Sequence, residues 1–301
     1  MSSGADSLKT IFYALGANLA IFSAKAVAAV MTGSGAMFAE AVHSLADCAN
    51  QVLLLFGLKS ARREASDDHP LGQGKAVYFW SFLVALLLFS VGGAFSIYEG
   101  VHKLSHPEPL RWPWIALGVL AFGVAAESFS MWGCLREVNK ARDGKSLYRW
   151  FRDSRQSELI VVFGEDFAAL CGLVIALAAV ALTMTTGNPL FDAIGTLAIG
   201  VLLVLVAIFV AIEVKALLIG QSADAELRRD IAAFLRSRGE VECVFNLITL
   251  QLGPDVMVAI KAQMRESSSG GIVDAINAVE RDMKARFPQI RWSFFEPDLA
   301  D

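Results

Sequence analysis

The chain has 301 residues, of which 55% are apolar and 19% are charged, and its mean hydropathy is +0.52. Soluble globular proteins have roughly 45–50% apolar and about 25% charged residues, so the composition argues against a water-soluble domain. The formal net charge is −4, and the basic residues form only short clusters, which excludes an extended surface for nucleic acid. The four cysteines lie far apart and form neither a C-x-x-C pair nor a disulfide framework.

Six apolar windows are each long enough to cross a bilayer, for which an α-helix needs about 20 apolar residues. They are residues 8–30, 35–58, 77–101, 112–135, 159–185 and 190–218. Short turns rich in glycine and proline separate several of them, so neighbouring helices are expected to be antiparallel. The N-terminus lacks a basic n-region and a small-residue cleavage site, so we expect the first window to be retained rather than removed as a signal peptide.

Basic residues predict the orientation of these windows. Four basic side chains lie in residues 59–75 and seven in residues 136–155, whereas the three opposite loops offer Lys103 and Arg111. The positive-inside rule therefore places both termini and both basic loops in the cytoplasm or a matrix-like compartment. We expect a multi-pass protein of a bacterial inner membrane, with an organellar membrane as the alternative.

The residues after Gly220 have the composition of a water-soluble module. Apolar periodicity predicts helices at residues 224–238 and 272–287, and strands at residues 242–252, 256–264 and 291–295. The order α-β-β-α-β is typical of a small ferredoxin-like α+β domain. We therefore predict an all-α six-helix transmembrane bundle over residues 1–220, followed by a cytoplasmic domain over residues 221–301.

The second window carries an unusual stripe of polar side chains: Glu40, His43, Asp47, Asn50 and Gln51. A charged side chain at the bilayer centre costs about 2.5–3.5 kcal/mol, so such a stripe indicates a functional site. Spacings of three and four residues place these side chains on one helix face. An imidazole and a carboxylate on that face can bind zinc, which takes nitrogen and oxygen ligands. We predict His43 and Asp47 as metal ligands, the alternative being a simple hydrogen bond between helices.

The fifth window contains the adjacent acids Glu165 and Asp166. Adjacent residues point about 100° apart on a helix, so only one of them can point straight at a metal ion. We predict Asp166 as the direct ligand and Glu165 as a flanking ligand, a proton acceptor or a supporting group. Counted from the cytoplasmic helix ends, Asp166 and Asp47 differ in level by about 10 Å.

Other polar residues in the windows are candidates for supporting roles. Lys25 and Glu40 lie at similar distances on either side of the turn at residues 33–35, so a buried ion pair with a structural role is expected. Asn18 either supports a metal ligand or forms a hydrogen bond between helices, and Asn50 is a further supporting candidate. The sequence does not indicate a partner for Glu127 in the fourth window.

Four segments of the chain carry a recognisable pattern: residues 16–25, residues 32–34 with the letters T-G-S, residues 40–47 with E-A-V-H-S-L-A-D, and residues 69–75 with H-P-L-G-Q-G-K. Together they resemble the cation diffusion facilitator family of zinc-type metal/proton antiporters. The resemblance runs over the whole chain, and residues 46–51, 165–170 and 295–298 resemble the branch that contains the mitochondrial zinc exporter. It implies a homodimer, a tetrahedral transport site shared by spans two and five, and a metallochaperone-like cytoplasmic domain.

The chain departs from the family pattern at several positions. The fifth span of the family carries His-x-x-x-Asp, but Val162 stands four residues before Asp166. Glu165 or water must then complete the site, and a site richer in oxygen also suits manganese or iron. The tail contains no histidine and a single cysteine, Cys243, so we expect it to lack regulatory metal sites and to serve dimerisation.

We therefore expect efflux of a divalent cation, Zn²⁺ first of all, in exchange for protons. Metal ligands must be deprotonated, so the same groups can couple the two fluxes. The expected partners are the metal ion, protons, membrane lipid and a second copy of the chain, with no resident cofactor and no nucleic acid.

Three alternatives remain open. The same fold can carry Mn²⁺ or Fe²⁺ instead of Zn²⁺. An intramembrane metalloenzyme would need an open coordination position and a general base, a role that Glu165 could fill. A membrane scaffold that dimerises through its tail would make the polar stripe structural. Because no H-E-x-x-H motif is present, we predict that the protein is not an enzyme.

Overall fold

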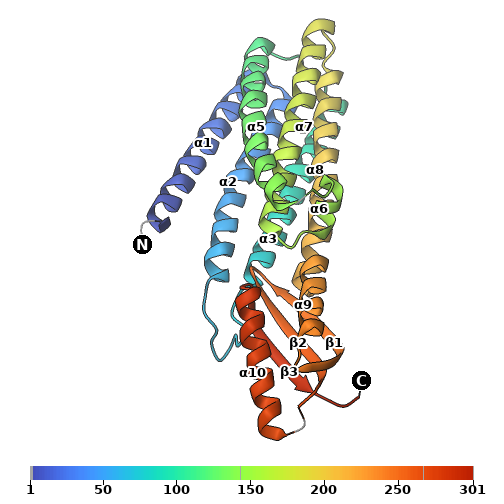
Figure 1. Cartoon of the computed structure of the whole chain (residues 1–301). Coiled ribbons are helices and arrows are strands. Elements are labelled where there is room, and N and C mark those ends of the chain that lie inside the picture. Colours follow the sequence, from blue (N-terminus) through green and yellow to red (C-terminus); the bar gives the residue numbers. More distant parts are fainter. Residues whose placement is uncertain (1–2, 143, 267, 301) are drawn as a thin grey trace. The chain divides into compact units, whose positions relative to one another are not determined.

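Long helices follow one another up to residue 219 in the computed structural model, which describes residues 3–142, 144–266 and 268–300 (Figure 1). The helices are α1 (Ser3–Thr32), α2 (Gly35–Ala61), α3 (Ala76–Leu87), the π-helical segment η1 (Leu88–Ala94), α4 (Phe95–Ser105), α5 (Pro113–Ala141), α6 (Leu147–Asp153), α7 (Ser157–Thr186) and α8 (Leu190–Ile219). The short helix α6 was not predicted; the side chain of Ser146 caps its N-terminus.

Five helical stretches among the described residues are long and apolar enough to cross a membrane. They are Gly35–Ala61, Ala76–Ser105, Pro113–Ala141, Leu159–Thr186 and Leu190–Ile219. These stretches coincide with the second to sixth predicted windows. In α1 the apolar stretch is shorter and covers Asn18–Thr32. A helical core of the membrane type is therefore confirmed, while the sixth span stays a prediction.

The chain divides into two compact units, which are described separately. The first contains Met1–Phe56, Trp80–Lys145 and Glu158–Glu213, and the second contains Gly57–Phe79, Ser146–Ser157 and Val214–Asp301. The second unit thus includes the loop between the second and third predicted windows in addition to the tail. The predicted boundary at residue 220 stays a prediction.

Close glycine contacts join the third apolar stretch to α8 in the first unit. A Cβ atom on Gly93 would lie 2.7 Å from Cγ2 of Val204, and one on Gly100 would lie 2.7 Å from the backbone nitrogen of Leu197. On α8, a Cβ atom on Gly200 would lie 2.6 Å from the backbone nitrogen of Ile97. Small residues let helix backbones approach closely in membranes, so these positions hold the two helices together.

Asp192 of α8 fixes the start of α2, the helix that carries the polar stripe. Its carboxylate accepts hydrogen bonds from Oγ of Ser34 at 2.5 Å and from the backbone nitrogen of Gly35 at 2.7 Å. Lys103 of α4 forms an ion pair with Asp192 at 3.3 Å. A carboxylate at a helix N-terminus satisfies free N–H groups and complements the helix dipole. This network sets the position of α2 relative to α4 and α8.

A three-stranded sheet and two helices form the tail in the second unit. The elements are α9 (Ala225–Ser237), β1 (Val241–Leu252), β2 (Asp255–Met264), α10 (Ser269–Arg286) and β3 (Ile290–Pro297). The strand order is β1-β2-β3, with β1 antiparallel and β3 parallel to β2 (Figure 1). The small C-terminal sheet is confirmed, and the assignment to the ferredoxin-like fold stays a prediction.

Both helices of the tail pack on the same face of the sheet. Ile231 of α9 and Met283 of α10 belong to one buried cluster with Val258 and Ile260 of β2. Because side chains alternate along a strand, the other face carries residues of the opposite parity and has no helix of the tail on it.

The H-P-L-G-Q-G-K loop has a packing role within the second unit. Gly74 lies so close to Leu252 that a Cβ atom would collide with its carbonyl oxygen. The buried hydroxyl of Tyr78, in the first turn of α3, accepts a hydrogen bond from the backbone nitrogen of Gly253 at 2.9 Å. The loop and the start of α3 are thereby attached to the turn between β1 and β2, and only glycine permits this approach at residue 74.

Candidate functional site

His43 and Asp47 lie one turn apart on α2, in the first unit. His43 is 1% exposed and Asp47 is 19% exposed, and His43 Nδ1 lies 3.8 Å from Asp47 Oδ1. This distance is too long for a hydrogen bond. Both ring nitrogens of His43 and Oδ1 of Asp47 are buried and have no hydrogen-bond partner among the described residues. Buried polar atoms are normally paired with protein groups, water or an ion, so these atoms are available to bind one.

The two acids of α7 face different helices. Oε1 of Glu165 accepts a hydrogen bond of 2.6 Å from Nδ2 of Asn50 on α2. Oδ2 of Asp166 accepts one of 3.2 Å from Oγ of Ser130 on α5. The predicted supporting residue Asn50 therefore contacts a predicted ligand. The choice of Asp166 as the direct ligand stays a prediction, since Glu165 is the acid that bonds to α2.

The levels of these groups agree better than the sequence count suggests. Asn50 lies three residues after Asp47, which corresponds to a rise of about 4.5 Å. Because Asn50 meets Glu165 directly, the part of α2 just after Asp47 lies beside the part of α7 that carries Glu165 and Asp166.

Lys25 and Glu40 form the expected ion pair. Nζ of Lys25 lies 3.0 Å from Oε2 of Glu40, and both side chains are fully buried. Nζ of Lys25 also donates a hydrogen bond of 2.8 Å to Oγ of Ser44 on α2. These contacts join α1 to α2 one turn before His43. Asn18 is half-buried on α1 two turns before Lys25, and its supporting role stays a prediction.

Two residues of α5 also bear on the candidate site: Ser130, which the sequence did not indicate, and Glu127, for which it indicated no partner. Ser130 binds Asp166, as described above, and Glu127 interacts electrostatically with Asp47, Lys25 and His43. In the sequence, Glu127 could be noticed only as a single acidic residue within an apolar window. Its partners lie on α1 and α2, far away in the sequence, so only the packing of the helices reveals them.

The predicted ligands lie on neighbouring helices but do not surround one point. No group of three or more histidine, cysteine, aspartate or glutamate side chains in the described residues is arranged to hold a metal ion. The donor set nevertheless combines an imidazole with several carboxylates, which suits a divalent cation of the zinc or manganese type. A change in the positions of α2 and α7 would be needed to gather these donors around an ion.

Comparison with known proteins adds independent information. The family model described as "Cation efflux transmembrane domain" matches residues 11–219. The mitochondrial proton-coupled zinc antiporter SLC30A9 of Xenopus laevis is 31% identical over 285 residues, which cover 94% of this chain and 50% of that protein. The human protein of the same name is 32% identical over 231 residues, covering 76% of this chain and 41% of its own length.

A plant relative gives a similar match. Metal tolerance protein C4 of Arabidopsis thaliana is 32% identical over 250 residues, covering 82% of this chain and 55% of its own length. The chain thus spans about half the length of these curated relatives.

Proposed function

Because the chain belongs to the cation efflux family, we propose that it exports Zn²⁺ from the cytoplasm in exchange for protons. The observation that carries this proposal is the buried donor set of His43 and Asp47, whose atoms have no hydrogen-bond partner among the described residues. The pairing of Asn50 with Glu165 supports a site shared by α2 and α7. The names of the relatives, proton-coupled zinc antiporters, point to the same ion and counter-ion.

Coupling follows from the chemistry of the ligands. A histidine nitrogen or a carboxylate must lose its proton before it binds a metal ion, so loading of Zn²⁺ releases protons from the site. Protons that enter from the opposite side then displace the ion. Alternating access arises when the helices around the site rock and open it to one side at a time. None of these steps converts a substrate chemically, so they describe a transporter and not an enzyme.

The proposal includes a topology of six spans, with α1 as the first and both termini in the cytoplasm. The helical length of α1, Ser3–Thr32, supports its role as a span, and the basic loops support the orientation. We assign the α-β-β-α-β tail to the ferredoxin-like fold and the protein to a bacterial inner membrane, surrounded by lipid.

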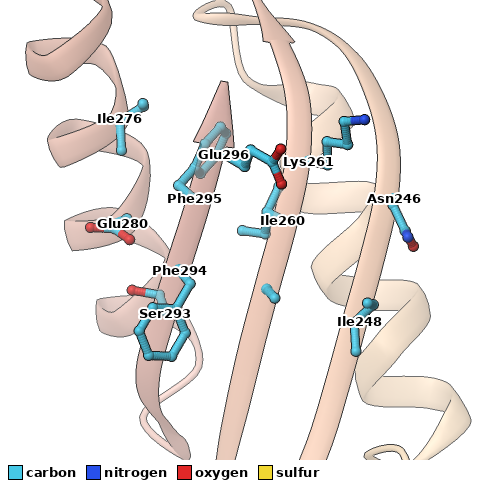
Figure 2. Close-up of a pocket in the computed structure, with 11 residues that line it drawn as sticks. Asn246, Ile248, Ile260, Lys261, Ile276, Glu280, Ser293, Phe294, Phe295 and Glu296 are labelled. Atoms are coloured by element: carbon cyan, nitrogen blue, oxygen red, sulfur yellow. The ribbon is translucent and has the colours of Figure 1, made fainter. Parts of the chain in front are cut away.

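The tail is proposed to pair with a second copy of the chain. The sheet face without helices carries Ile248, Ala259 and Phe294 in one cross-strand row. Ile248 and Phe294 are each 54% exposed. Figure 2 shows these two side chains on β1 and β3, among the residues that line a pocket of about 470 Å³; its lining also includes Ile276 and Glu280 of α10. Burial of such an apolar row would stabilise a dimer.

The direct test is Zn²⁺ uptake by the purified full chain in liposomes, with and without an imposed pH gradient. We expect protons to move in the direction opposite to Zn²⁺. Without a zinc gradient, we expect Zn²⁺ movement to stop when the pH gradient is collapsed. Hydrolysis of a substrate without transport would favour a metalloenzyme. A correctly folded dimer that shows no transport and no hydrolysis would favour a scaffold.

Metal preference is expected to change when Val162 is replaced by histidine. Val162 lies three residues before Glu165 and four before Asp166, so a new imidazole would point between the directions of these two acids. An added nitrogen ligand should shift transport towards Zn²⁺ and away from Mn²⁺. Competition between the two ions in the liposome assay measures this shift. Val162→Ala is the matched control, and an unchanged preference in Val162→His would mean that residue 162 does not face the site.

The tail is expected to fold without metal. Its described residues hold no cluster of metal-ligating side chains, whereas a structural zinc site would contribute about 10–16 kcal/mol to folding. An excess of chelator should therefore leave the melting temperature of a fragment of residues 222–301 unchanged, and Cys243→Ser should melt like the unaltered fragment. If the fragment dimerises, melting should depend on its concentration. A large drop with chelator would contradict the prediction.

A further inference from the structure

One face of α5 is directed towards the candidate cation site. Gly123, Glu127 and Ser130 are spaced by four and three residues, so their Cα–Cβ directions lie on the same helix face. Contacts fix both ends of this face. A Cβ atom on Gly123 would lie 3.8 Å from Cε of Lys25, and Oγ of Ser130 binds Asp166 at 3.2 Å.

Glu127 therefore lies between Lys25 of α1 and Asp166 of α7. Its half-buried side chain interacts with the charges of Asp47 and His43 on α2, and Asp166 in turn interacts with Glu127. Lys25 directs its ammonium group to Glu40 and Ser44. Three carboxylates from three helices, those of Asp47, Glu127 and Asp166, thus interact electrostatically with one another.

The neighbouring donors provide a second, independent indication of a ligand. Both ring nitrogens of His43, a residue 1% exposed, are without a hydrogen-bond partner in the described part of the chain, as is Oδ1 of Asp47. Carboxylates that confront each other in a region of low dielectric repel strongly, and a divalent cation between them offsets this repulsion. The imidazole and the two carboxylates of α2 and α5 form a donor set of the kind that such a cation takes.

We propose that Glu127 supplies a carboxylate ligand to the transported cation from α5 and broadens its selection towards cations that prefer oxygen ligands. This inference rests on the proposed function, because it assigns a further residue to the same site. Carboxylate ligands suit Mn²⁺, whereas Zn²⁺ binds well to nitrogen donors. Loss of Glu127 therefore weakens Mn²⁺ binding more than Zn²⁺ binding.

The test measures binding of Zn²⁺ and Mn²⁺ to the full chain in detergent, together with transport in liposomes. In Glu127→Gln, which keeps the shape and removes the charge, Kd for Zn²⁺ should rise by about tenfold to hundredfold, and Kd for Mn²⁺ should rise further. Glu127→Asp keeps the carboxylate and should retain a ratio of Mn²⁺ to Zn²⁺ affinity close to that of the unaltered chain. The control is Glu137→Gln on the same helix, where Glu137 is 61% exposed and pairs with Lys140; its affinities should not change.

Two results would overturn the inference. The first is an unchanged Kd of Glu127→Gln for both ions, in an assay where the unaltered chain binds and transports Zn²⁺. The other is an equal loss in Glu127→Asp and Glu127→Gln with no change in the ratio of the two affinities, which would show that Glu127 acts on folding and not as a ligand. If the unaltered chain neither binds nor transports a divalent cation, the proposed function itself fails, and the inference with it.

Discussion

Replacement of either His43 or Asp47 by alanine is expected to abolish zinc-driven proton flux and to leave the protein folded in the membrane. Neither Oδ1 of Asp47 nor a ring nitrogen of His43 has a hydrogen-bond partner in the residues that the structure describes, so truncation removes a ligand without leaving a partner group unpaired. We expect transport rates to fall by about a hundredfold or more, because loss of a direct ligand should cost at least as much as loss of an outer-shell partner, which costs about 10- to 100-fold.

The measurement compares proton flux in liposomes with the melting temperature of the same variants. His102→Ala is the matched control for His43→Ala, because His102 is an exposed histidine on α4. It should transport like the unaltered chain. Retained flux in both His43→Ala and Asp47→Ala would remove these residues from the transport site, whatever the melting temperatures.

Replacement of Lys25 or Glu40 is expected to act mainly on stability and to lower the free energy of unfolding. Their charges are fully buried and 3.0 Å apart. Removal of one partner leaves an uncompensated buried charge, which destabilises a protein by about 3–5 kcal/mol. Lys25→Met and Glu40→Met should therefore each lower the unfolding free energy strongly. The double variant should recover most of the loss, because apolar residues of similar volume can replace a buried ion pair.

Unfolding of the full chain in detergent, followed by denaturant or heat, measures these differences. Glu137 and Lys140 provide a matched exposed pair on α5, with side chains 61% and 73% exposed. Changes to that pair should cost less than about 1 kcal/mol. A double Lys25→Met, Glu40→Met variant as unstable as the sum of the single variants would show that the two charges do not stabilise each other.

The positions of the apolar helices and of the tail elements follow from local patterns in the sequence. Apolar length predicts each long helix, and alternation predicts each strand to within a few residues, because both signals arise from the side chains of one segment. The ion pair of Lys25 and Glu40 could also be predicted. Both residues lie close to a short turn, so the hairpin geometry alone brings them to one level.

The rotation of each helix about its own axis was decided by packing. The sequence places Glu165 and Asp166 about 100° apart, but only the neighbouring helices determine that Glu165 meets Asn50 and Asp166 meets Ser130. The same holds for Glu127, whose partners lie on α1, α2 and α7. Periodicity is a property of one segment, whereas the meeting of two faces depends on contacts between segments far apart in the chain. For this reason the sequence by itself indicated two helices that carry the predicted ligands, and the tertiary structure decided which side chains of these and other helices meet.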